Sequence, residues 1–118
     1  MLNKNFKADV EAIIENRRDN SQNPFPYPNP FGQGYRPAHL VRPDYLTTGI
    51  HHYLDKEEVY FGETALAEIA FLSPEVYPKC LWVGKRIPFQ EGSRITGYAT
   101  ITKIFNKILE ATDIGKKD

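Results

Sequence analysis

RITGYATITKI, residues 94–104, carries the clearest structural signal in the chain. Its alternate positions form one small or aliphatic set and one hydroxylic or aromatic set: Ile95, Gly97, Ala99 and Ile101 against Thr96, Tyr98, Thr100 and Thr102. Successive side chains of a β-strand point to opposite faces of the sheet, so this period of two is typical of a strand buried on one face. β-Branched and aromatic residues favour strands and add to the signal. We predict a strand over 94–104.

A tight turn and another strand precede this segment. Glu91-Gly92-Ser93 separates it from residues 83–90, which also have a strand-like composition. A two-stranded hairpin needs left-handed backbone in its turn, and Gly92 provides it without steric cost. Gly97 suits a position where a neighbouring strand approaches closely. The sequence therefore predicts an antiparallel hairpin of the fifth and sixth strands.

Earlier segments repeat the pattern of short strands separated by turns. We predict strands over 6–13, 35–41, 45–53 and 64–72. The last of these places four apolar side chains on one face: Ala65, Ala67, Ile69 and Phe71. Turn signals lie at 60–63 and at Ser73-Pro74, and a helix beginning at Ala8 is the alternative for the first segment, because Ala and Glu favour helices. Several short strands with such turns indicate an antiparallel barrel or sandwich.

Residues 16–33 are polar and then rich in proline, above all over 20–33. Proline cannot donate to a β-ladder, so this stretch is predicted to be a long loop. Its aromatic residues admit two interpretations: Phe25, Tyr27 and Phe31. They either anchor a polyproline II segment in the groove of a partner or fold back onto the domain, where proline lowers the entropy lost on ordering.

Length and charge restrict the class of protein. The 118 residues suit one globular domain, and Lys plus Arg equals Asp plus Glu at 15 each. Proteins that bind nucleic acid through its phosphates usually have a clear excess of Lys and Arg over Asp and Glu. Cys80 has no second cysteine to pair with, which suits a reducing compartment and a small buried side chain. With no leader and no apolar run of about 20 residues, we expect a cytoplasmic protein without a membrane span.

The chain shows no arrangement typical of catalysis. Gly84-Lys85-Arg86 lacks the glycine spacing and the hydroxyl of a phosphate-binding loop, and a nucleophile elbow is missing too. His51 and His52 are neighbours, so on a strand they point to opposite faces and cannot chelate one metal together. His39 is interpreted as a surface or packed residue. We expect no enzyme activity, cofactor, metal or bound nucleotide.

Three blocks of sequence resemble a known family. They are Gly34-Tyr35-Arg36-Pro37, then Arg42 with Thr47-Thr48-Gly49, and then Glu91-Gly92-Ser93-Arg94-Ile95-Thr96-Gly97. Together they resemble the third, C-terminal domain of elongation factor Tu, which reads Gly-Tyr-Arg-Pro-Gln, Arg-Thr-Thr and Glu-Gly-Gly-Arg-Thr-Val-Gly at these places. The resemblance covers about residues 6–105 and implies an all-β fold, a six-stranded antiparallel closed β-barrel standing without the GTPase domain. Residues 106–118 are then a tail, with a short helix or an extension over 106–114.

The same resemblance implies candidate binding residues. In that family the third domain contacts the T-stem of aminoacyl-tRNA, the GTPase domain and the nucleotide-exchange partner. This chain keeps Gly92 in the turn and Thr48 as a hydroxyl donor, and Arg17 or Arg18 matches a basic residue before the second strand. It departs from the family where Ala38 replaces a glutamine and Ser73 replaces a frequent lysine. The lost contacts are worth about 1 kcal/mol or more apiece, so the implied tRNA binding is weak.

Two arginines belong to the blocks themselves. Arg36 follows Tyr35 and either stacks on an aromatic ring or pairs with Glu91 across the sheet. Arg94 closes the turn of the last hairpin. Both are candidate contacts for RNA or for a protein partner.

The leading hypothesis is a non-catalytic protein-interaction module linked to the translation machinery. It would mimic the third domain of elongation factor Tu and engage a translation factor, a toxin or a regulator. One alternative is an RNA binder that keeps weak recognition of the aminoacyl-tRNA T-stem through Gly92, Thr48 and Arg17 or Arg18. Another is a detached subunit that pairs with a separate GTPase domain.

Overall fold

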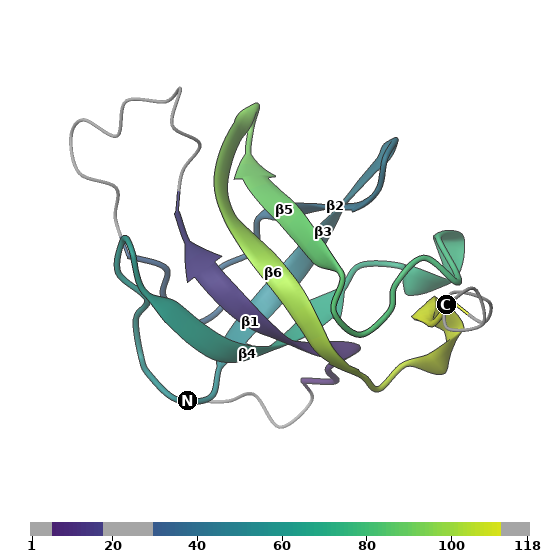
Figure 1. The fold of residues 1–118 in the computed structure, drawn as a ribbon, viewed down its shortest axis with the longest axis horizontal. Coiled ribbons are helices and arrows are strands. Elements are labelled where there is room, and N and C mark those ends of the chain that lie inside the picture. The colour runs from purple at the N-terminus through teal and green to yellow at the C-terminus, as the bar shows by residue number, and fades with distance from the viewer. Residues whose placement is uncertain (1–5, 18–29, 112–118) are drawn as a thin grey trace.

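The computed structural model describes residues 6–17 and 30–111, and in them six strands close into a barrel (Figure 1). The strands are β1 (Val10–Asn16), β2 (Ala38–Arg42), β3 (Tyr45–Tyr53), β4 (Thr64–Phe71), β5 (Arg86–Glu91) and β6 (Arg94–Ile104). Their order around the barrel is β1-β4-β3-β2-β5-β6, and every neighbouring pair is antiparallel. The all-β class and the closed six-stranded antiparallel barrel are confirmed.

The connections define two ends of the barrel. The β2–β3 end carries the β2–β3 turn, the β4–β5 connection with the 3₁₀ helix η1 (Pro74–Val76), and the 3₁₀ helix η2 (Lys107–Leu109) after β6. The β3–β4 end carries the long β3–β4 loop and the β5–β6 turn. In Figure 1, η1 and η2 lie together on the right, and the β3–β4 loop lies on the left. Neither 3₁₀ helix in the described part of the chain has the length and apolar character to span a bilayer.

Two strands have the predicted bounds, 45–53 for β3 and 94–104 for β6. The prediction for the first strand was wrong at both ends, because β1 begins at Val10 and continues to Asn16. Before β1, Asp9 N still donates to Ile69 O at 2.8 Å, and the carboxylate of Asp9 adds two contacts: its Oδ2 accepts from Phe71 N at 2.7 Å and its Oδ1 from Asn106 Nδ2 at 2.9 Å. The side chain of Asn16 is buried, so the inward-facing positions run on to the end of the strand.

Two other strands begin later than predicted. β2 begins at Ala38 and not at Tyr35, because Gly34 has a φ of 84° and Pro37 has no N–H to donate. β5 begins at Arg86 and not at residue 83, because a turn in which Lys85 N donates to Trp82 O at 3.1 Å comes first. β4 ends at Phe71, one residue before the predicted end and two before Ser73, which has a φ of 49°.

β2 and β5 have the shortest pairing of any two neighbouring strands in the barrel. These strands pair through Ala38 with Gln90 and His39 with Phe89. Lys85 O accepts from Ile101 N of β6. In an antiparallel strand the backbone N and C=O groups of every second residue face the same neighbour, so those of residues 85, 87 and 89 face β6. The backbone N of Pro88 therefore faces β2. Proline has no N–H, which removes a donor from this seam. The amine of Lys85 bridges the gap, since Nζ donates to Val41 O and Cys80 O, each at 2.7 Å.

The core lies inside the barrel and under the β2–β3 end. Ala65, Ala67, Ile69 and Phe71 are all buried, and so is Cys80, which confirms both predictions. The alternation of buried and partly exposed residues in β6 breaks at its start. The pairing register with β5 shifts near Phe89 and Gln90, so Thr96 turns inward while Ile95 stays half-buried. Residues 107–109 form η2, whose Leu109 is buried, and Leu81 forms a parallel bridge with Glu110.

Candidate functional site

Two of the predicted site residues lie on one wall near the β5–β6 turn. Thr48 of β3 is opposite Ala38 of β2, and Ala38 is opposite Gln90 of β5. The side chain of Gln90 donates to Gly92 O at 2.6 Å. Thr48 and the turn at Gly92 therefore belong to one continuous strip of the outer surface, which we call the β3–β2–β5 wall.

Gly92 has the predicted left-handed backbone, with a φ of 61°. It stands in the turn between Glu91 and Arg94, which are opposite one another, and a Cβ added there would meet nothing within 4 Å. The space beside its α-carbon is therefore open to an approaching phosphate or backbone, although its carbonyl already accepts from Gln90. Arg94 is exposed beside them.

Arg17 lies on the other side of the same turn. Its backbone N donates to Thr96 O at 3.1 Å, and its side chain approaches Glu15 at 4.0 Å. Glu15 is also held by Arg86, whose Nε and Nη2 donate to its carboxylate at 2.9 and 3.0 Å. The hydrogen bond from Arg86 holds the pKa of Glu15 below its ordinary value. A stable negative charge thus stands next to Arg17.

Arg36 is exposed, and the pairing expected for it with Glu91 is not the one that forms. Tyr35 takes that place, because its hydroxyl donates to Glu91 Oε2 at 2.6 Å and also bonds Thr96 Oγ1 at 2.7 Å. Arg36 Nε makes a long contact of 3.5 Å to Gly34 O. The Gly-Tyr-Arg-Pro block therefore ties the segment before β2 to the β5–β6 hairpin through its tyrosine.

Of the three aromatic residues predicted in the proline-rich loop, the structure describes Phe31 alone. Phe31 is buried and stacks on Tyr35 with ring centroids 4.3 Å apart, so this aromatic folds back onto the barrel. Phe25 and Tyr27 lie outside the described residues, as does Arg18.

Histidines of β2 and β3 form a buried polar cluster that sequence reasoning missed. His39 and His51 point into the barrel, and His51 Nδ1 bonds the hydroxyl of Tyr53 at 2.9 Å. His39 was interpreted as a surface or packed residue, and the structure shows it packed. His52 lies on the opposite face of β3, as predicted, with Nδ1 3.9 Å from a Glu68 carboxylate oxygen. Across residues 6–17 and 30–111, no three His, Cys, Asp or Glu side chains gather as a metal site.

No protein-family model matches this chain. A search of curated proteins gives no match either. The similarity to the third domain of elongation factor Tu therefore rests on the three sequence blocks quoted above and stays a prediction.

The β2–β3 end carries an apolar surface that sequence reasoning also missed. Large apolar side chains stay exposed at the start of β3, in the β4–β5 connection and after β6: Tyr45, Leu46, Leu72, Val76, Val83, Phe105 and Ile108. Two of these segments touch, since Tyr45 and Tyr77 have ring centroids 5.2 Å apart and Tyr77 OH donates to Leu72 O at 2.8 Å. Strand periodicity cannot detect such a surface, because most of its members lie outside the strands.

Proposed function

We propose that this chain is a non-catalytic module that binds protein partners in the cytoplasm, in the manner of the third domain of elongation factor Tu. One observation carries the proposal: the apolar surface at the β2–β3 end. Leu72 is 65% exposed and Val76 is 55% exposed, although both stand beside buried Tyr77. Exposed apolar side chains that gather on one part of a soluble domain mark contact sites for other proteins.

The charge of the chain supports a protein partner over RNA. Exposed arginines of the β5–β6 hairpin and the end of β1 alternate with carboxylates: Arg17 and Arg86 with Glu15, and Arg94 with Glu91. A surface with both signs gains little from the release of counterions on RNA binding. It can still pair with complementary charges on a protein.

The test is affinity capture from bacterial lysate with chemical crosslinking, using the full chain and a matched pair of variants. Leu72→Asp with Val76→Asp places charges in the apolar surface, whereas Ile13→Asp changes an exposed apolar side chain on the outer face of β1. We expect components of the translation machinery to be captured by the native chain and by Ile13→Asp, and lost from the double variant. Equal recovery by all three proteins would contradict the proposal.

RNA binding is the second candidate, and the β3–β2–β5 wall favours it. There the space beside the α-carbon of Gly92 is open, Arg94 belongs to the same turn, and Thr48 lies on the same wall. Binding of tRNA through phosphates must weaken steeply as salt rises to about 200 mM. A titration at low salt that shows no complex, or a complex that Arg94→Gln leaves unchanged, removes this candidate. Native mass measurement with a separate GTPase domain tests the detached-subunit alternative.

A further inference from the structure

The β3–β4 loop, residues 54–63, combines exposed apolar side chains with negative charge. Leu54, Tyr60 and Phe61 stay in solvent, the last two with 53% and 48% of their surface exposed. The same loop carries four carboxylates and one amine: Asp55, Glu57, Glu58 and Glu63, and Lys56. The fold does not need these aromatic side chains for its core, so their presence calls for another explanation.

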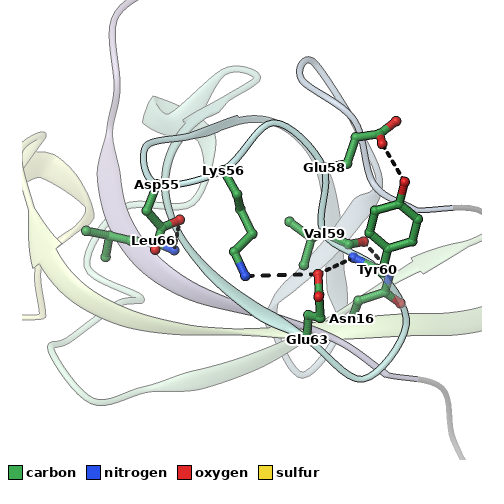
Figure 2. A network of polar contacts seen from close by, with 8 residues as sticks. All are labelled: Asn16, Asp55, Lys56, Glu58, Val59, Tyr60, Glu63 and Leu66. Atoms are coloured by element: carbon green, nitrogen blue, oxygen red, sulfur yellow. Dashed lines mark hydrogen bonds and ion pairs between the residues drawn. The ribbon is translucent and has the colours of Figure 1, made fainter.

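Polar contacts hold this loop in one shape (Figure 2). Glu63 Oε1 accepts from Tyr60 N at 2.9 Å and lies 4.0 Å from the amine of Lys56. The hydroxyl of Tyr60 donates to Glu58 Oε1 at 2.8 Å, and Asp55 Oδ1 accepts from Leu66 N at 3.1 Å. Each of these carboxylates fixes a backbone or aromatic group.

Two buried residues fasten the loop to the barrel. Val59 is fully buried and exchanges backbone hydrogen bonds with Phe31, at 2.9 and 3.0 Å. Asn16 at the end of β1 donates from Nδ2 to Val59 O at 2.7 Å, and its carbonyl accepts from Gly62 N at 2.8 Å. The loop is therefore supported from the barrel side along most of its length.

A tight turn presents the two aromatic residues. Glu63 N donates to Tyr60 O at 2.9 Å and Gly62 has a φ of 89°, as in a type II turn with glycine in its third position. Tyr60 and Phe61 occupy the first two positions. Aromatic side chains on a rigid turn lose little entropy when a partner covers them, which is the property of binding hot spots.

A hollow beside Phe61 adds a place for a partner's side chain. Its volume is about 330 Å³, and its walls include Phe61, Glu15 and Glu63. Arg17 also lines it, but its guanidinium is drawn toward Glu15 at 4.0 Å. The hollow joins an aromatic ring to carboxylates, which suits the apolar stem and charged head of a lysine or arginine.

We propose that the 54–63 loop is a docking surface for a basic segment of a partner protein. Lysine or arginine side chains of that segment meet the carboxylates of the loop, and one apolar residue packs on Tyr60 and Phe61. The choice of partner follows from charge complementarity, which determines orientation and association rate at such surfaces. The inference rests on the proposed function in that the chain works by binding proteins, but it uses the end of the barrel opposite the apolar surface.

The test uses the full chain and a fluorescein-labelled peptide of lysine and arginine with one central leucine. Fluorescence anisotropy measures its binding beside two controls, the same peptide with glutamate for every basic residue and the same peptide with serine for leucine. We expect the basic peptide to bind most tightly, the serine peptide less tightly and the glutamate peptide not at all. Binding must weaken as salt rises, because exposed charges are screened.

Variants locate the site. Tyr60→Ser with Phe61→Ser removes the exposed rings and is expected to weaken binding about tenfold or more, as loss of a hot spot does. Glu57→Lys reverses a charge that takes no part in the polar contacts described above for the loop. It is expected to weaken binding several-fold. Leu72→Asp with Val76→Asp, at the other end, must bind as the native chain does, so failure of the proposed function leaves this result unchanged.

Four outcomes overturn the inference. They are no binding of the basic peptide, equal binding of the glutamate peptide, full binding by the folded Tyr60→Ser, Phe61→Ser variant, and a native dimer that this variant converts to a monomer. The last result would show that a second copy of the chain covers the surface. Circular dichroism of each variant establishes that the barrel is folded before its binding is compared.

Discussion

His39 and His51 meet inside the barrel with their Nε2 atoms 2.9 Å apart. At that distance one ring donates and the other accepts, so the accepting ring must be neutral for the bond to form. Burial lowers the pKa of His39 to about 4, although the carbonyls of Pro37 and Thr47 partly oppose the shift. Burial, and then the neighbouring His39, hold the pKa of His51 well below its ordinary value. Phe89 packs on both rings, at 5.3 and 5.1 Å between centroids.

This pair predicts a loss of stability in mild acid. Because both pKa values are lower in the folded protein, the unfolded chain binds more protons below about pH 6.5. The free energy of unfolding is therefore unaffected above that pH, and it falls as the pH drops from about 6.5 toward 4. Each histidine contributes up to about 1.4 kcal/mol per pH unit.

Urea unfolding at several pH values between 7.5 and 4.5 measures the effect. His39→Gln with His51→Gln removes both titrating groups and must flatten the slope in this range, whatever its stability at pH 7. His52→Gln serves as the control, because it changes a histidine on the opposite face of the same strand. A double variant with the native slope would contradict the assignment.

Substitution by alanine is expected to cost much more stability at Gly97 than at Gly32. A Cβ on Gly97 would lie 2.2 Å from Glu15 O and 2.5 Å from Phe89 Cζ, so alanine there forces β1 and β6 apart. A Cβ on Gly32 would meet nothing within 4 Å. Gly97→Ala is expected to cost about 3 kcal/mol or more, as severe overpacking does, and Gly32→Ala less than about 1 kcal/mol. Thermal melts followed by circular dichroism compare them, and similar melting temperatures would refute the close approach.

The regular part of the fold follows from the sequence. β6 alternates over most of its eleven residues, so its bounds can be predicted without knowing its neighbours, and the bounds predicted for β3 also agree with the structure. The start of β1 cannot be predicted in this way, because residues 6–9 alternate as well. At this place the carboxylate of Asp9 accepts from Phe71 N and Asn106 Nδ2, which lie 62 and 97 positions away along the chain. Such contacts exist only once the barrel has closed.

The candidate surfaces show the same limit. Gly92 was found because a tight hairpin turn has a local sequence signature, and its φ of 61° agrees. The bond between His39 and His51 depends on the register of β2 against β3, which no local pattern gives. Glu91 was expected to meet Arg36, but the neighbouring Tyr35 reaches it, a difference of one position that only the path of the backbone determines.

Asn16 offers a test of the buried attachment of the 54–63 loop. Its Nδ2 donates to Val59 O at 2.7 Å, in a site where the asparagine is 1% exposed. Asn16→Ala removes the donor and is expected to cost about 1 to 3 kcal/mol. Asn16→Asp is expected to cost more at neutral pH, because a buried carboxylate would face the carbonyl oxygen of Val59. Urea unfolding ranks the variants, and an aspartate variant as stable as native protein would show that this bond contributes nothing.

Lys85 closes the seam that Pro88 leaves between β2 and β5. Its amine donates to Val41 O and Cys80 O, each at 2.7 Å, and lies 4.5 Å from the centre of the Trp82 ring. Hydrogen bonds from a charged donor contribute about 1.5 to 3 kcal/mol, so Lys85→Met is expected to lower the free energy of unfolding by that amount.

The rate at which the Cys80 thiol reacts with a thiol reagent measures how firmly this seam is held. It is 8% exposed, and burial raises its pKa, so it should react slowly with a thiol reagent in the native protein. In Lys85→Met the Cys80 carbonyl loses its partner, the segment loosens, and the reaction is expected to speed up. Lys103→Met is the matched control, because the side chain of Lys103 is 65% exposed and makes only a 3.9 Å ion pair with Glu11. If the thiol reacts at the same rate in all three proteins, the amine of Lys85 does not hold β2 and β5 together.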